Sequence, residues 1–260
     1  MDLQSKEQAM QGMALQAKTT AMRKGMIATK AKVGFVIDIS GSMQSEFANG
    51  TVQEELERMF AIAKHFDDDG ELDIFVFGTS AEYVGTVNDS NWYNAVQYHG
   101  MGGHITVLGK KYRLQNGTYY KLGLQAAYNF YFKPGWEHNT KKIGGVFGLG
   151  GANYPVVRET QEYPVFLVFS TDGDNMDKRE TIEFVKNASA MPLFIQFAAF
   201  GRGPFNGLSQ IDNMKGRYVD NAGMFEARDF RSCSDSQLYD GLLNEFPAWL
   251  KLTQGEGWYR

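Results

Sequence analysis

The sequence predicts an α/β domain built on a doubly wound, mostly parallel sheet with helices on both faces. Short continuous apolar runs, such as residues 33–37 and 165–170, are typical of strands buried on both faces of a parallel sheet. Segments with apolar residues at helical spacing follow these runs after short links. Hydrophobic residues make up 43% of the 260 residues and aromatic residues 14%, which is enough to form a core.

Residues 1–30 predict an N-terminal helical arm that precedes this domain. They contain no proline, and apolar residues recur at helical spacing: Met10, Met13, Ala14, Ala17 and Ala21. Because this apolar stripe is thin, the helix would be marginal in water by itself. The arm either packs on its own domain or docks on another subunit to form a homo- or hetero-oligomer.

The domain itself, residues 31–255, alternates strands and helices. We expect a strand at 33–37, a helix at 52–66 that ends before the acidic turn 67–70, and a strand at 73–78. The later elements continue the alternation. We expect a helix at 119–132 up to Pro134, a strand at 165–170 and a helix at 178–190 capped by Asp177. A strand at 192–200, a weaker strand at 217–220 and a helix at 236–250 follow.

Two stretches, at about 99–117 and 133–163, interrupt this alternation. Both are rich in glycine and aromatic residues, and the first contains strand-like patches at 105–108 and 112–114. We expect β-hairpin insertions rather than separate domains. Long ordered insertions of this kind often carry contacts.

Composition argues against several classes of partner. The net charge is −4 with both signs mixed, which gives no electrostatic basis for binding nucleic acid. No run reaches the roughly 18 apolar residues needed to cross a bilayer, and residues 1–30 lack the apolar core of a secretory signal. The single Cys233 suits a reducing compartment. We therefore expect no membrane partner and a cytoplasmic location.

Oxygen-bearing side chains gather where the predicted strands end, which is where ligands bind in open parallel sheets. Asp38, Ser40 and Ser42 follow the first strand, Asp172 follows strand 165–170, and Thr118 stands before helix 119–132. Carboxylates and hydroxyls are ligands that Mg²⁺ prefers, and Mn²⁺ or Ca²⁺ also accepts such a set. An ion with only two carboxylates stays electrophilic, so it can take an Asp or Glu from a protein partner.

These strings resemble the metal-ion-dependent adhesion site of von Willebrand factor A (vWA) domains. Residues 38–43, 117–118 and 171–173 are similar to its three loops. Over roughly residues 33–250, apart from the insertions, the chain looks closest to the vWA domains of the bacterial tellurium-resistance family, through residues 52–53, 56–58, 66–70, 219–223, 238–240 and 246–250. The resemblance implies that Ser40, Ser42 and Thr118 bind the ion directly and that Asp38 and Asp172 bind it partly through water. It also suggests a tellurite- or stress-response setting.

The second loop has three candidate strings. Relatives carry Gly-Gly-Thr-Asn-Tyr there, and Gly150-Gly151-Ala152-Asn153-Tyr154 matches that order but places a methyl group at the ligand position. Gly102-Gly103-His104-Ile105-Thr106 is followed by strand-like sequence. Thr118 has the hydroxyl and a helix of suitable length after it, so we favour Thr118.

The sequence offers no catalytic set, so we do not expect an enzyme. The four histidines lack metal-ligand spacing, and neither a phosphate-binding P-loop nor a Gly-x-Ser-x-Gly motif is present. A phosphatase with Asp38 as nucleophile would need a second carboxylate where Ser40 stands. The first hypothesis is therefore a metal-dependent protein-binding module. The alternative is a structural subunit of a larger assembly, such as a phage or secretion particle, that uses the arm for oligomeric contacts.

Overall fold

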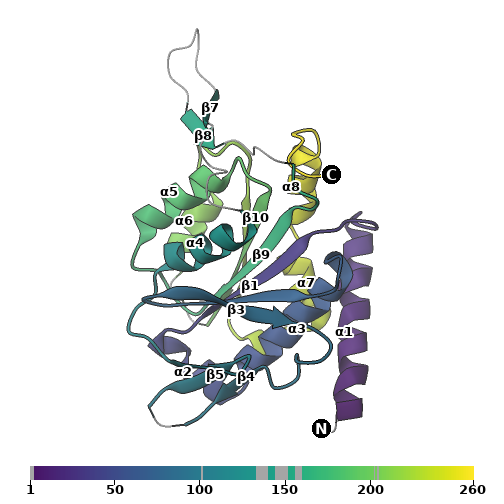
Figure 1. Ribbon diagram of the computed structural model, residues 1–260, viewed down its shortest axis with the longest axis vertical. Coiled ribbons are helices and arrows are strands. Elements are labelled where there is room, and N and C mark those ends of the chain that lie inside the picture. The colour runs from purple at the N-terminus through teal and green to yellow at the C-terminus, as the bar shows by residue number, and fades with distance from the viewer. Residues whose placement is uncertain are drawn as a thin grey trace.

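The computed structural model describes residues 3–100, 102–132, 160–201, 203 and 205–260, together with the backbone of 140–143 and 152–155. A six-stranded sheet lies at the centre (Figure 1), in the order β11-β10-β9-β1-β2-β3. Its strands are β1 (Lys32–Asp38), β2 (Leu72–Phe77), β3 (Ala81–Val87), β9 (Val165–Thr171), β10 (Leu193–Phe200) and β11 (Ala222–Ala227). All neighbours pair in parallel except β2 and β3. The predicted fold class is confirmed.

Helices cover both faces of the sheet (Figure 1). One face carries α4 (Tyr120–Tyr131), α5 (Lys178–Ala188) and α6 (Asn206–Asp212), and the other carries α1 (Leu3–Arg23), α3 (Thr51–Phe66), α7 (Asp235–Leu242) and α8 (Phe246–Thr253). Strand β1 shows how the two cores form: Phe35 and Ile37 pack with the α3 side, whereas Val36 packs with the α4 side. Every residue of β9 and β10 is buried, as their continuous apolar sequence requires.

Helix α1 packs along α3 and α7 (Figure 1). It buries Met10, Ala17, Thr20 and Ala21, and Lys6 Nζ lies 3.3 Å from Glu57 Oε1 of α3. Small side chains at the buried positions allow close packing of the helices despite the thin apolar stripe. None of the helices in the described ranges has the length and apolar character needed to cross a membrane.

The two insertions contain antiparallel strands. The first, with the residues just before it, forms a three-stranded sheet of β4 (Val96–Tyr98), β5 (His104–Val107) and β6 (Lys110–Arg113). The second contains a hairpin of β7 (Thr140–Ile143) and β8 (Ala152–Pro155). Pro134 and the remaining parts of that insertion, 133–139, 144–151 and 156–159, lie outside the described residues.

Three predictions about the C-terminal half of the chain need correction. The strand expected at 217–220 is wrong: the edge strand is β11, which pairs with β10 from Ala222, while Arg217 and Asp220 form an ion pair at 2.6 Å. The helix expected at 236–250 is two helices, α7 and α8, with Pro247 in the first turn of the second. Asp177 occupies the N-cap position of α5, but its carboxylate makes no cap hydrogen bond there.

Asp177 instead caps α4. Its carboxylate accepts hydrogen bonds from the backbone N–H groups of Tyr120 at 3.0 Å and Lys121 at 2.9 Å, in the first turn of α4. The Asn175 amide donates to the same carboxylate at 2.8 Å. The loop after β9 therefore fixes the start of α4 and, with it, the preceding loop that carries Thr118.

Candidate metal centre

Two neighbouring strands bring the first and third loops together. Strands β1 and β9 pair in parallel with Ile37 opposite Ser170, so Asp38 and Asp172 follow the same edge of the sheet. The loop after Asp38 continues as a short 3-10 turn, Gly41–Met43. This turn starts the chain toward α2 (Gln44–Ala48) and then α3. The loops thus stand on two rigid central strands.

Hydrogen bonds connect four of the five predicted ligands, Asp38, Ser40, Ser42 and Asp172. The backbone N–H of Ser40 donates to Asp38 Oδ1 at 2.7 Å. The Oγ atoms of Ser40 and Ser42 lie 3.0 Å apart. The Ser42 hydroxyl donates to Asp172 Oδ1 at 2.8 Å. The structure therefore brings these four residues into one cluster of oxygen atoms.

Asp38 is a buried carboxyl group with no counter-ion among the described residues. It is 0% exposed, and its Oδ2 accepts a hydrogen bond from Thr171 Oγ1 at 2.8 Å. Burial raises the pKa of Asp38 to about 7, although the hydrogen bonds from Ser40 favour the ionised form. Within the described ranges no Lys, Arg or His forms an ion pair with it. A buried carboxylate of this kind gains from a nearby cation.

Asp172 adds a second carboxyl group to the same cluster. Burial raises its pKa, the hydrogen bond from Ser42 lowers it, and the negative charge of Glu46 raises it again. The charge of Asp172 also raises the pKa of Asp38. The negative charge of Asp172 thus disfavours the ionised form of Asp38, and a divalent cation near both carboxylates would offset this repulsion.

Thr118 lies on a loop tied to both of the others. The backbone of Gln115 bonds to the first loop in two places, since Gly41 N donates to Gln115 O and Gln115 N donates to Ile39 O, each at 2.8 Å. The carbonyl of Thr118 accepts a hydrogen bond from the N–H of Met176, on the third loop, at 2.9 Å. Backbone contacts thus tie the loop of the half-buried Thr118 to the two loops that carry the cluster.

The competing strings of the second loop lie elsewhere. Ala152 and Tyr154 belong to β8, and Figure 1 shows that hairpin at the end of the molecule away from α2, which follows the Asp38 loop. Gly150 and Gly151 lie outside the described residues. Thr106 belongs to β5, where its hydroxyl lies 2.5 Å from His99 Nε2. Thr118 therefore stays the proposed ligand of the second loop.

The sequence did not reveal that Tyr120 and Thr171 support the cluster from the interior of the protein. Tyr120 donates a hydrogen bond to Thr171 Oγ1 at 3.2 Å, and Thr171 in turn donates to Asp38. Tyr120 also bonds to the carbonyl of Gly173, and burial raises its pKa. Because Thr171 ends an apolar strand and Tyr120 lies in a helix, only the spatial pairing of β9 with α4 shows these contacts.

A cavity of about 380 Å³ lies beside the cluster. Thr171 and Asp172 form part of its wall, and Glu46 and Glu55 form another part. Glu55 of α3 is 1% exposed and accepts a hydrogen bond from Ser170 Oγ at 2.8 Å. Burial raises the pKa of Glu55 to about 8. The acidic character of the cluster therefore continues into the protein interior.

A separate acidic group, Asp67, Asp68 and Asp69, lies at the other end of β1. There the Lys32 ammonium lies 3.2 Å from Asp67 Oδ1 and 3.4 Å from Asp69 Oδ2, and it also pairs with Asp68. Lys32 thus already places one positive charge against the three carboxylates. The proposed ligands lie at the opposite end of β1, so this group is not part of the candidate centre.

Comparison with known sequences places the chain among vWA domains. Residues 30–128 and 151–259 match the family described as vWA-TerF-like, the vWA found in the TerF C terminus. The chain is also 30% identical over 240 residues to the uncharacterized protein YcbR of Bacillus subtilis (strain 168), an alignment that covers 92% of this chain and 86% of that protein.

Comparison with solved structures gives distant likenesses. Proximal thread matrix protein 1 of the mussel byssus matches with a TM-score of 0.49 and 14% identity, over 82% of this chain and 46% of that one. The ArnB paralog VWA2 of Sulfolobus acidocaldarius matches with a TM-score of 0.42 and 13% identity, over 84% of this chain and 46% of that one. The chain thus spans about half the length of these solved proteins.

Proposed function

Because the chain belongs to the vWA-TerF-like family of vWA domains, we propose that its three strand-end loops hold a divalent cation that grips an acidic side chain of a protein partner. The observation that carries this proposal is the hydrogen-bonded cluster of Asp38, Ser40, Ser42 and Asp172, with its buried carboxyl group that has no counter-ion within the described ranges. Membership of the family supports a binding role for the domain as a whole, and the cluster provides the oxygen ligands that a cation needs.

The proposed ligand set is Asp38, Ser40, Ser42, Thr118 and Asp172. In this set the hydroxyls of Ser40, Ser42 and Thr118 bind the ion directly, and the two carboxylates bind it partly through water. The cluster supports this division, because Asp38 is fully buried while Ser42 is exposed. An ion in front of the serine hydroxyls would keep water on the side that faces a partner. Mg²⁺ is the proposed ion, and Mn²⁺ or Ca²⁺ would be accepted by the same oxygen atoms.

The chemistry of the ligands selects the kind of partner. Only two of the five proposed ligands are carboxylates, and the hydroxyls carry no charge, so the ion stays electrophilic. It can therefore bind one more anionic oxygen, which an Asp or Glu side chain can provide. This is a role in binding: the described side chains around the cluster hold the loops in place, and the proposal gives the site no catalytic step. A tellurite- or stress-response setting in the cytoplasm is part of the same proposal, and it rests on the resemblance to the vWA domains of the tellurium-resistance family.

The test is capture of partners from a cell extract with the purified protein on a resin. We expect bound proteins that are retained with Mg²⁺, released by a chelator, and lost with Ser42→Ala. Ser45→Ala is the matched control, since the Ser45 hydroxyl bonds to Glu46 instead of the cluster. Equal capture with Mg²⁺ and with chelator, or by wild type and Ser42→Ala, would rule the proposal out.

A second candidate is a structural subunit that assembles through α1. The outer side of this helix exposes Leu3, Leu15 and Met22, which are 53%, 65% and 46% exposed. Exposed apolar residues on one helix favour contact with another subunit. For this role, replacing Leu15 by Lys would change the molar mass measured by light scattering, whereas a chelator would leave it unchanged.

A further inference from the structure

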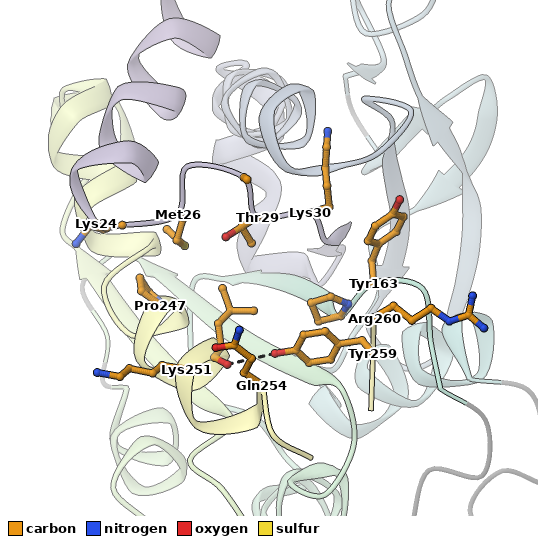
Figure 2. Close-up of a pocket in the computed structure, with 14 residues that line it drawn as sticks. Lys24, Met26, Thr29, Lys30, Tyr163, Pro247, Lys251, Gln254, Tyr259 and Arg260 are labelled. Atoms are coloured by element: carbon orange, nitrogen blue, oxygen red, sulfur yellow. Dashed lines mark hydrogen bonds between the residues drawn. The ribbon is translucent and has the colours of Figure 1, made fainter. Parts of the chain in front are cut away.

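A groove lies at the end of β1 opposite the candidate metal centre. It is formed by residues 24–30 between α1 and β1, by Tyr163 and Pro164 before β9, and by α8 with the residues after it (Figure 2). Its volume of about 550 Å³ is within the range of ligand pockets. The seven residues of β1 span roughly 20 Å, so the groove and the metal loops are separate surfaces.

Part of the groove, its floor, is apolar, and Tyr259 within it is held in place. Figure 2 shows Met26, which is buried, and Pro247 on one side of the groove and Tyr259 on the other. The Tyr259 hydroxyl bonds to Thr253 Oγ1 at 2.8 Å and to the carbonyl of Leu250 at 3.3 Å. The Tyr259 ring also stacks on Trp249, with 6.3 Å between ring centroids. An apolar floor of this kind suits one apolar side chain of a ligand.

The rim of the groove is basic. Of the fourteen residues that line it, the charged ones are all cations: Lys24, Lys30, Lys251 and Arg260. Figure 2 shows the ends of their side chains around the periphery. Lys24 Nζ lies 3.7 Å from Asp240, and Lys30 Nζ donates to the backbone carbonyl of Asp67 at 3.0 Å.

In the described part of the chain, three of these cations have no carboxylate partner: Lys30, whose ammonium bonds to the backbone carbonyl of Asp67, and Lys251 and Arg260. Among the described residues, the side chains of Lys251 and Arg260 form no ion pair. The chain as a whole carries a net charge of −4, so a lining whose charged side chains are all cations departs from the overall balance, although the acidic group Asp67, Asp68 and Asp69, paired with Lys32, lies at the same end of β1. Lys251 and Arg260 are therefore the cations of this groove that remain free for an anionic ligand.

We infer that this groove binds an extended acidic segment of a partner protein, which places one apolar side chain on the floor and carboxylates against Lys251 and Arg260. An inorganic anion would leave the apolar floor unused. A nucleic acid would need a wider basic surface than this rim. An acidic peptide with an apolar residue satisfies both the floor and the rim, and peptide recognition commonly combines such features.

The test starts from a random peptide library displayed on phage and selected on the immobilised protein in the presence of a chelator. The chelator keeps the metal loops from selecting acidic peptides, so the outcome does not depend on the proposed function. We expect selected peptides with Asp or Glu around a Leu, Ile, Phe or Met. A selection without acidic enrichment would overturn the inference.

The selected peptide is then synthesised with a fluorophore, and its affinity is measured by anisotropy. We expect the double variant Lys251→Glu/Arg260→Glu to weaken binding by about tenfold or more, since two attractive contacts become repulsive. Arg179→Glu/Lys215→Glu makes the same charge change at exposed positions outside the groove and should bind as wild type does. Replacing the apolar residue of the peptide by Ser should also weaken binding. Equal affinities for the two double variants would contradict the inference.

Discussion

The hydroxyl of Ser42 donates a hydrogen bond to Asp172 Oδ1 at 2.8 Å, although the two residues are 130 positions apart in the sequence. This contact joins the loop after β1 to the loop after β9. Ser42 also lies 3.0 Å from Ser40 Oγ, so a continuous line of oxygen atoms crosses the edge of the sheet. In the proposed ion-bound form, the same oxygens would face the cation and the hydroxyl protons would point away from it.

Thr118→Ala tests which threonine completes the site. We expect this variant to bind Mg²⁺ at least about tenfold more weakly, because a direct oxygen ligand is lost. The contacts that hold the Thr118 loop are made by the backbone, so the fold should be retained. Isothermal titration calorimetry measures the affinity. Thr106→Ala is the control, since Thr106 belongs to the three-stranded sheet and its hydroxyl contacts His99 there. A larger loss in Thr106→Ala than in Thr118→Ala would contradict the assignment.

Asp177→Ala tests the cap that the third loop provides to α4. The variant removes the acceptor for the N–H groups of Tyr120 and Lys121. We expect a loss of about 1–3 kcal/mol in the free energy of unfolding measured with urea. Glu180→Ala, at an exposed position in the first turn of α5, should change it by less than about 0.5 kcal/mol. Similar values for the two variants would show that Asp177 does not cap α4.

Glu55 gives the unfolding free energy a specific pH dependence. Its pKa is about 8 in the folded protein, above its ordinary value of 4.5, because burial disfavours the charged form. Between these two values the folded protein binds more protons than the unfolded chain. The contribution of Glu55 to stability is therefore complete below pH 4.5 and is lost as the pH rises toward 8.

Glu55→Gln isolates this contribution. The amide oxygen can still accept the hydrogen bond from Ser170, but it carries no charge at any pH. We expect the wild-type free energy of unfolding to fall more steeply from pH 5 to pH 8 than that of the variant, by at most about 1.4 kcal/mol per pH unit for one group. Urea titrations in a chelator across this range measure the two slopes. Parallel slopes would show that Glu55 is ionised in the folded protein.

Local sequence signals were enough to predict the central strands. Strands β9 and β10 are continuous apolar runs, and burial on both faces requires such runs. Strand β3 was missed because it lies at the edge: most of its side chains are only partly buried, and its sequence alternates weakly. The strand predicted at 217–220 is wrong, because Arg217 and Asp220 form an ion pair there and the pairing with β10 starts at Ala222.

The site was predictable where one loop follows one strand. Asp38, Ser40, Ser42 and Asp172 come directly after two buried strands, so parallel pairing of those strands was enough to bring them together. The supporting contacts were not predictable in this way. The bond from Tyr120 to Thr171 spans 51 positions, and Asp177 caps a helix that begins 57 positions earlier. Such contacts depend on how α4 lies on the sheet, which no local pattern encodes.

Binding of Mg²⁺ to the metal-free protein tests the central claim most directly. Isothermal titration calorimetry would compare wild type, Ser42→Ala and Ser45→Ala after treatment with a chelator. We predict one saturable site in wild type and in Ser45→Ala, and at least about tenfold weaker binding in Ser42→Ala. The reason is that the Ser42 hydroxyl bonds to Asp172 in the cluster, whereas the Ser45 hydroxyl bonds to Glu46. No saturable Mg²⁺, Mn²⁺ or Ca²⁺ binding by wild type, or an affinity that Ser42→Ala leaves unchanged, would contradict the account.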